Sequence, residues 1–449
     1  MPTALHPSSL EAPAAGGLRD TPRVGFGIVV FYALAAFLVG LVRSWGIPLV
    51  GLMPVGELIL AGVLGHAVLW VAITRRLPAP LPSPRVLGVL VACQMVSFAS
   101  YIVADFWRDS APVDMLRGWL RMVFILIDIG GLALLFGASE RSFVWMMLGA
   151  GFSGFQALII PPLFNEYWKF GFGYPLTLLV LLAVPRFLGF WASLLACVGM
   201  GVLHAALDFR SAGAICIGLG VLNGLFVVPQ QVRKILVGAV AVVLLITSPW
   251  TAPMMFADTD GRANRSNVER SSMMQAAWEG FTESPLIGHG SWFSNSDVMD
   301  NFLLIRSQKA SLAGGGMGFK DDDFEGVAIH SQILVTLAEG GFFGGTFFFV
   351  YAGFICWAFW FCLVETPWTW LTPMRIFVLF SSFWDVWMSG FTGPIRVNIA
   401  MTAVLISVLW AERQKLRAAR RQPAETEDDP ENLSLLGATS SRSGAARTL

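Results

Sequence analysis

Three side chains have the types and positions expected of a site that binds phosphate and moves a proton: His330, Arg210 and Arg270. His330 lies where a polar segment meets a long apolar run, in IHSQILVTLAEGGFFGG. Neutral imidazole has an ordinary pKa of about 6.5 and can accept a proton near neutral pH, so His330 is a candidate general base. The alternative is an interfacial histidine that caps the helix beginning there or extends its ring to the membrane interface.

The two arginines are candidates for binding a phosphate group. Arg210 begins an apolar run in DFRSAG, and Arg270 lies in the first turn of a short predicted helix, Val268 to Gly280, with Asn267 as its N-cap. A guanidinium keeps its charge and binds phosphate through two parallel hydrogen bonds. Alternatively, Arg210 extends from a span end to the interface, and Arg270 is a solvated loop charge.

Three further residues are weaker candidates. Asp385 is an acid inside an apolar run, which is costly in lipid and often functional. Glu339 lies in the run that follows His330, and His289, between two glycines, is interpreted as a turn residue. The five cysteines lie in apolar runs without a close CxxC pair, and no Walker, dinucleotide or HExxH motif occurs. We therefore predict neither a metal site nor a cofactor.

The composition indicates the class of protein that holds these residues. Of 449 residues, 55% are hydrophobic and only 13% are charged. A soluble domain is about 25% charged, so this chain lacks the polar surface that several water-facing domains need. Its 30 basic and 30 acidic residues give no net charge, which argues against a nucleic-acid binder that relies on a basic surface. The composition predicts an all-α polytopic membrane protein.

A helix needs about 20 mainly apolar residues to cross the hydrocarbon of a bilayer. By this criterion we predict twelve spans, at 24–42, 47–73, 86–104, 119–138, 142–160, 172–185, 187–207, 211–228, 235–250, 331–363, 374–391 and 395–411. The run 172–185 is short, and 331–363 is long enough to include a turn or a steep tilt.

Basic residues between the spans set the predicted orientation. With the N-terminus in the cytoplasm, the cytoplasmic side receives Arg75, Arg76, Arg85, Arg141, Arg186, Arg233, Lys234 and the basic run 413–421. The predicted organisation is a cytoplasmic tail at 1–23, nine spans within 24–250 and an external loop at 251–329. Three spans within 330–411 follow, and then a basic and finally disordered tail at 412–449.

The order of these features resembles the O-antigen ligase and O-antigen polymerase superfamily. The resemblance rests on three features. Arg210 begins a predicted helix at the external face, an external segment extends from Arg270 through PLIGHG, and HSQILVTLAEGGFFGG leads into a span. It covers about Leu203 to Cys362, and the N-terminal half is similar only in hydropathy. Members commonly have His-Asn where this chain has His-Ser, and Ser-Arg-Gly where it has Phe-Arg-Ser.

The resemblance implies an activity, partners and a location. Members are lipid-linked glycosyltransferases with a helical, GT-C-like fold in the bacterial inner membrane. They move a glycan from undecaprenyl diphosphate to a sugar hydroxyl, on lipid A-core or a growing polysaccharide, at the periplasmic face and without metal or nucleotide. Direct displacement inverts the anomeric configuration. The implied roles are general base for His330 and diphosphate binding for Arg210 and Arg270.

Three interpretations stay open on the sequence. A ligase passes a finished glycan to lipid A-core, and a polymerase of O-antigen or exopolysaccharide extends a lipid-linked chain with the same donor chemistry. A transporter or lipid-linked sugar flippase is the alternative from another class. Carriers usually have polar residues in mid-membrane and repeated halves. Here the candidate residues lie at one face and no repeat is visible, which favours the enzyme.

Overall fold

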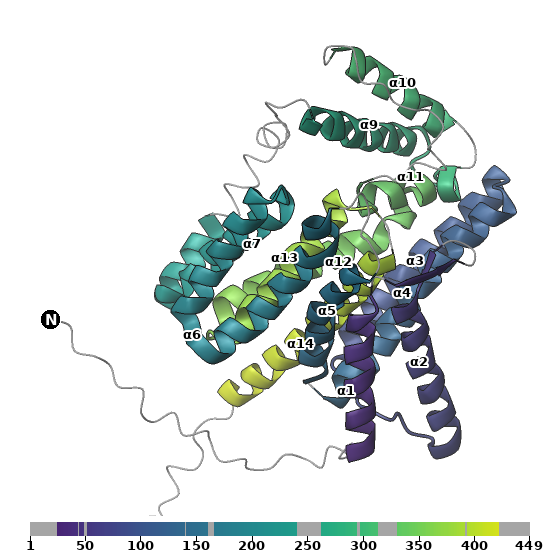
Figure 1. Ribbon diagram of the computed structural model, residues 1–449. Coiled ribbons are helices and arrows are strands. Elements are labelled where there is room, and N and C mark those ends of the chain that lie inside the picture. The colour runs from purple at the N-terminus through teal and green to yellow at the C-terminus, as the bar shows by residue number, and fades with distance from the viewer. Residues whose placement is uncertain are drawn as a thin grey trace, which may run out of the picture.

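The computed structural model describes residues 25–43, 45–48, 52–139, 141–159, 166–239, 262–293, 297–312, 330–390 and 393–421. Nearly all of these residues are helical (Figure 1). The longer helices are α1 (Phe26–Leu41), α2 (Val55–Thr74), α3 (Pro84–Arg108), α4 (Pro112–Ala138), α5 (Arg141–Phe152), α6 (Gly173–Ala206), α7 (Arg210–Gly224), α9 (Arg262–Glu283), α10 (Asp297–Leu312), α11 (Gln332–Gly344), α12 (Thr346–Trp360), α13 (Thr372–Met388) and α14 (Gly393–Arg421).

Seven helical segments of the described residues are long and apolar enough to cross a membrane: Val55–Thr74, Pro84–Arg108, Pro112–Ala138, Tyr167–Ala206, Arg210–Val227, Thr346–Glu365 and Pro394–Arg420. The protein is therefore a helical, multi-pass membrane protein. Helix α1 is apolar but shorter. The total of twelve spans stays a prediction. Helices α1, α5 and α13, at the predicted spans 24–42, 142–160 and 374–391, have only 16, 12 and 17 residues, and the predicted span 235–250 lies mostly outside the described residues.

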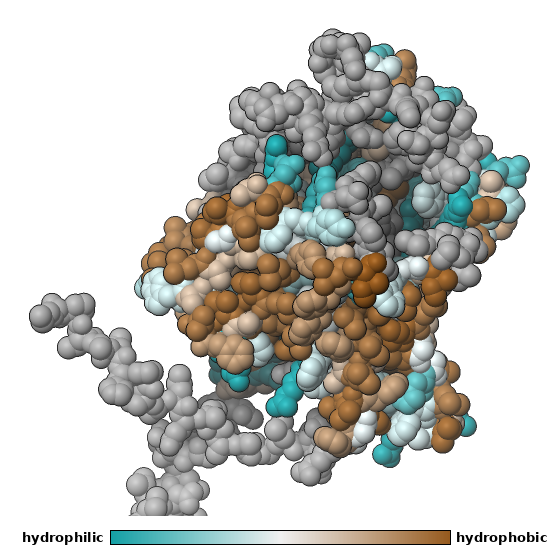
Figure 2. All heavy atoms as spheres, viewed as in Figure 1, coloured by the Kyte–Doolittle hydropathy of each residue, from teal (hydrophilic) through white to brown (hydrophobic). Residues whose placement is uncertain are grey.

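The helices differ in how much apolar surface they bury. In the most apolar 18-residue stretch of α4 and of α14, two thirds of the residues are buried. The buried share is 28% in α2 and in the segment that contains α6. Apolar side chains of these outer helices remain exposed, as in Val68, Phe187 and Trp191. Figure 2 shows the result as a broad apolar band across the molecule with polar side chains above and below it. Such a band is the surface that lipid tails would cover.

Several predicted helix boundaries are wrong for a local reason. The predicted span 47–73 begins instead at Val55, because β1 (Gly46–Pro48) and β2 (Leu52–Pro54) form a short antiparallel hairpin before it. A proline ends each strand, and proline cannot donate within a helix interior. The predicted spans 172–185 and 187–207 lie in one helical stretch, which breaks at Gly189, where φ is 79° and ψ −163°.

The C-terminal third is also divided differently from the prediction. The predicted span 331–363 forms two helices, α11 and α12, and Gly341 inside α11 has non-helical angles (φ 65°, ψ −164°). Helix α14 does not end with the apolar run near residue 411 but continues through the basic residues to Arg421. Arginine, lysine, alanine and glutamine are good helix formers, so polarity alone does not stop the helix.

The segment predicted to be external, called the external segment below, forms a small packed unit at one end of the bundle over residues 262–293 and 297–312. Helix α9 packs on α10 and on α11 (Figure 1), with a hydrophobic core that includes Met273, Ala277, Phe302 and Val335. The predicted helix 268–280 is too short, since α9 extends from 262 to 283 and contains both its supposed N-cap and its supposed stop. The sequence pattern did not predict α10.

Candidate functional site

His330 lies directly before α11, next to a serine cap. Ser331 is the N-cap of α11, and its Oγ accepts a hydrogen bond from the Leu334 amide at 3.4 Å. The same hydroxyl donates to the Val386 carbonyl oxygen of α13 at 3.5 Å. Because serine supplies the cap, the alternative in which His330 caps the helix is wrong. The half-buried imidazole of His330 is left for another role.

Arg270 lies on α9, and its charge acts on His330. Burial lowers the pKa of the His330 imidazole below its ordinary 6.5, and the positive charge of Arg270 lowers that pKa further. Arg270 itself is exposed. Helix α9 is held on α11 by the small core described above. The structure therefore places two of the three principal candidates on elements that pack together, α9 and the start of α11.

Asp385 lies in the last turn of α13, next to the carbonyl that contacts the α11 cap. Its Oδ1 accepts a hydrogen bond from Ser389 Oγ at 2.7 Å, and Asn398 and Arg43 also lie close to this carboxylate. The Arg43 guanidinium lies 4.7 Å from the ring centroid of Tyr174. A basic residue that we did not select from the sequence thus lies near the same helix end.

Arg210 begins α7, as its position after an apolar run predicts. Its Nε donates to Asp208 Oδ1 at 3.1 Å, and the two side chains are 64% and 63% exposed. This contact is local, within the turn that joins α6 to α7. A common site for Arg210 with His330 and Arg270 stays a prediction.

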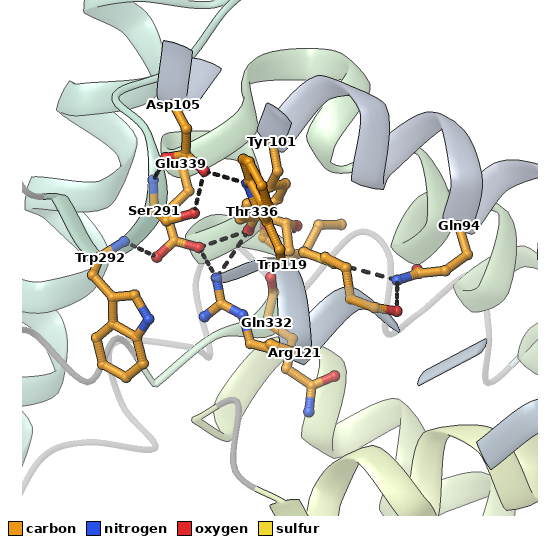
Figure 3. Close-up of polar contacts among 12 residues, drawn as sticks. Gln94, Tyr101, Asp105, Trp119, Arg121, Ser291, Trp292, Gln332, Thr336 and Glu339 are labelled. Atoms are coloured by element: carbon orange, nitrogen blue, oxygen red, sulfur yellow. Dashed lines mark hydrogen bonds and ion pairs between the residues drawn. The ribbon is translucent and has the colours of Figure 1, made fainter. Parts of the chain in front are cut away.

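A second polar cluster, which we call the buried lock, surrounds Glu339 of α11 (Figure 3). Arg121 of α4 forms an ion pair with Glu339 Oε2, and Tyr101 Oη of α3 donates to the same oxygen at 2.6 Å. The Trp292 amide donates to Glu339 Oε1 at 3.0 Å. Arg121 is 6% exposed and Glu339 is 1% exposed. Both carboxylate oxygens of Glu339 therefore accept hydrogen bonds from protein groups, and the carboxylate is shielded from solvent.

The buried lock continues through Asp105 of α3, whose carboxylate binds the external segment (Figure 3). Asp105 Oδ1 accepts from the Ser291 amide at 2.6 Å, and Oδ2 accepts from Ser291 Oγ at 2.8 Å and Trp119 Nε1 at 2.7 Å. Nearby, Arg108 Nε donates to the Gly288 carbonyl oxygen at 3.0 Å. Helix α3 thus attaches the external segment to the membrane bundle through charged hydrogen bonds.

The backbone of PLIGHG follows that of α11 closely. The amides of His289 and Gly290 donate to the carbonyl oxygens of Ala338 and Glu339, each at 2.9 Å. Gly288 has φ +80°, and a Cβ there would collide with the Glu339 carbonyl oxygen. The His289 ring nitrogen Nε2 bonds to the Gly280 carbonyl oxygen at 2.8 Å. We interpret His289 and Glu339, the weaker candidates of this region, as residues that hold the external segment in place.

Arg121, Tyr101 and Asp105 belong to the buried lock but escaped selection from the sequence. Arg121 stands alone in the apolar run GWLRMVF, and Asp105 lies near the end of an apolar run. An arginine and a glutamate in separate apolar runs are costly unless they pair. Searching for such complementary charges would have suggested the pairing of Arg121 with Glu339.

Gln332 is the first residue of α11 and is fully buried. Within the part of the chain that the structure describes, neither Nε2 nor Oε1 of this side chain has a hydrogen-bond partner. A buried polar group without a partner costs about 1–3 kcal/mol. Gln332 therefore holds hydrogen-bonding groups whose burial is not offset within the described residues.

Comparison with known proteins adds no assignment. No protein-family model matches the chain, and no curated protein matches it either.

Proposed function

We propose that this protein is an O-antigen ligase-like membrane glycosyltransferase that moves a glycan from undecaprenyl diphosphate to a sugar hydroxyl. The observation that carries the proposal is the packing of α9, which bears Arg270, on α11, whose first turn follows His330. A base that is neutral at pH 7 beside an accessible cation suits a reaction in which a hydroxyl loses a proton and a diphosphate leaves. The sequence resemblance supports the same reaction.

The proposed reaction is a direct displacement at the anomeric carbon. His330 accepts the proton of the acceptor hydroxyl while its oxygen bonds to the anomeric carbon and the bond to the diphosphate breaks. Arg270, with Arg210, binds the diphosphate as negative charge develops on it, which stabilises the transition state more than the ground state. The polyprenyl chain stays in lipid, so a site at the membrane boundary is required. The configuration inverts.

The proposed location is the bacterial inner membrane, with the site facing the periplasm. The distribution of basic residues between spans supports this orientation. A reporter that is active only in the periplasm should be active when it is fused after Leu312, at the end of α10, and silent when it is fused after Arg421. The reverse pattern would remove His330 from the periplasm and overturn the proposal.

The direct test is transfer by purified protein from a synthetic lipid-linked donor. We expect His330→Ala to lose transfer by about 10²–10⁴-fold, the contribution of a general base, while donor binding persists. His330→Gln, which keeps much of the side-chain volume, should be equally inactive. Transfer within a few-fold of wild type in either variant would contradict the base assignment, and Asp385 would become the next residue to test.

Ligase and polymerase share the donor chemistry, and a gel of surface polysaccharides from a deletion strain separates them. We expect loss of all long chains from lipid A-core while lipid-linked polymer is retained, which is the ligase result. Single repeats on the core would assign a polymerase instead. Loss of secreted polymer alone would assign an exopolysaccharide enzyme.

A second candidate function, transport, is favoured by one group of charges inside the bundle. Arg396 binds both carboxylate oxygens of Glu57, at 2.8 and 3.0 Å. Asp128 lies near this pair and is fully buried, and among the described residues neither of its oxygens has a hydrogen-bond partner. Buried acids of this kind mark ion pathways in carriers. Substrate uptake by proteoliposomes that is abolished in Asp128→Asn, with no transferase activity, would establish transport.

A further inference from the structure

A cavity of about 380 Å³ lies at the far end of α14 from the candidate site. It is formed by the helix over residues 230–239, the end of α12 with the turn Phe361–Glu365, and the last turns of α14. At 1.5 Å per residue, the stretch from Asn398 to Arg413 places it roughly 20 Å or more along α14 from Asp385. Its volume lies within the range of ligand pockets, about 300–1,000 Å³.

The lining of this cavity carries an excess of positive charge. Lys234, Arg413, Arg417 and Arg420 line it, against one acid, Glu365. Arg413 and Glu365 neutralise each other through a two-pronged ion pair, with Nε–Oε2 at 2.9 Å and Nη2–Oε1 at 2.5 Å. Among the described residues the other three cations form no ion pair. Within the described residues, three positive charges of this lining are therefore not neutralised by an acid.

The arginines come from one face of α14. Arg413, Arg417 and Arg420 are spaced four and three residues apart, which places them in one row along a helix. Lys415, on the same helix, does not line the cavity. A general preference for basic residues on one side of a membrane, or their attraction to a helix C-terminus, would not require this row to face a cavity. The arrangement indicates a ligand.

The rim of the cavity is apolar and aromatic. Trp360 and Leu416 line it and are 39% and 37% exposed. Trp360 lies within the candidate span Thr346–Glu365 and Leu416 within the candidate span Pro394–Arg420. Tryptophan is enriched where lipid headgroups meet the hydrocarbon. A ligand with a negative head and apolar chains fits both the cations and the exposed apolar side chains of this lining.

We propose that this cavity binds the phosphate headgroup of an anionic phospholipid, with Lys234, Arg417 and Arg420 contacting the phosphate. Basic pockets between membrane helices bind anionic headgroups in this way. Arg413 lines the cavity but is neutralised by its ion pair with Glu365, so it is not assigned to the phosphate. The lipid joins α14 to the helix over residues 230–239, elements distant in the chain. The proposal is independent of the transferase assignment.

The test is lipid binding by the purified full-length protein in a neutral detergent. Dioctanoyl phosphatidylglycerol is titrated in, with dioctanoyl phosphatidylcholine as the neutral lipid and inorganic phosphate as the free anion. Binding is counted by native mass spectrometry and followed by the thermal shift. We expect phosphatidylglycerol alone to bind and to stabilise. Each basic side chain contributes about fivefold to binding an anionic lipid, so Arg417→Gln with Arg420→Gln should weaken binding about 30-fold.

The matched control is Lys415→Gln with Arg76→Gln, which removes two charges that do not line the cavity. It should bind phosphatidylglycerol within about twofold of wild type, given the local nature of the contact. Lys234→Gln, on the helix over residues 230–239, should weaken binding about fivefold. This variant tests the proposal independently if the double arginine variant misfolds. Equal loss in the control, equal binding of phosphatidylcholine, or phosphate binding as strong as lipid binding would each overturn the proposal.

Discussion

Two polar regions adjoin α11, one around Glu339 and one at its N-terminus, and their charged groups differ in burial and pairing. In the buried lock, Glu339 is 1% exposed and both carboxylate oxygens accept hydrogen bonds, from Arg121, Tyr101 and the Trp292 amide. At the other end of the same helix, His330 is half-buried and Arg270 is exposed. One region satisfies every atom of its central carboxylate with protein groups, and the other leaves polar groups accessible.

This difference distinguishes a charge network that stabilises the fold from a group that could exchange a proton with a ligand. A buried charge is tolerated only when it is paired and hydrogen-bonded, and such a network then fixes the elements that supply its members. The buried lock joins α3, α4, α11 and the PLIGHG segment in this way. A group meant to exchange a proton with a ligand must instead keep a free lone pair. Glu339 does not meet that requirement, and the proposal assigns the proton exchange to His330 instead.

The largest expected effect comes from breaking the ion pair of the buried lock. Arg121→Gln leaves Glu339 buried without its cation, and such a change costs about 3–5 kcal/mol of stability. We expect a sharply lower melting temperature and a lower yield of folded protein in a neutral detergent. The exposed pair of Arg210 with Asp208 is the control. Asp208→Asn should change stability by about 0–1 kcal/mol, and equal losses would contradict the contrast between buried and exposed pairs.

The next effect separates the geometry of Arg270 from its charge. Arg270→Lys keeps the charge but loses the fork that matches a phosphate. Loss of one charged hydrogen bond, worth about 1.5–3 kcal/mol, should lower transfer about 10–100-fold without loss of stability. The readout is the rate of transfer from lipid-linked donor, with the melting temperature measured alongside. Full activity in the lysine variant would return Arg270 to the role of a solvated loop charge.

A smaller effect on stability is expected at Gly288. Alanine there must adopt φ +80° against the Glu339 carbonyl oxygen, and strain of this kind costs about 1–3 kcal/mol. We expect Gly288→Ala to loosen the external segment, seen as faster amide hydrogen exchange in α9. A Cβ added at Gly62 of α2 would meet only open space, so Gly62→Ala should be neutral or slightly stabilising. Unchanged amide hydrogen exchange in α9 of Gly288→Ala would show that the buried lock does not hold the external segment in place.

The smallest expected effect is a displacement of the acid limb of the pH–rate profile. Burial and the charge of Arg270 lower the pKa of His330, so the active neutral form persists below pH 6.5 and the rate falls as pH drops through the lowered pKa. Arg270→Gln removes the charge, so the limb of its residual activity should move to higher pH. Arg270→Lys keeps the charge and should leave the limb in place. An acid limb that does not move in Arg270→Gln would remove the electrostatic link between the two residues.

The sequence by itself determined the class of the protein and the type of its elements. Twenty-residue apolar runs must become helices in lipid, because no water is present to satisfy an exposed backbone. The low charge content and the start of α7 at Arg210 follow from composition and local pattern alone. Helix ends were less predictable where no strong breaker occurs, as in α9 and α14, whose polar residues continue the helix.

Only the tertiary structure decided which charges meet. Arg121 and Glu339 are 218 residues apart in the chain, and the periodicity of a helix carries no information about a partner at that distance. The same holds for Arg270 and His330, which come together because α9 packs on α11 through a small core of apolar side chains. Glu339 and His330 are nine residues apart, in or directly before the same apolar run. Packing placed one in a sealed network and left the other at an accessible junction, because burial depends on the surrounding helices and not on the residue type.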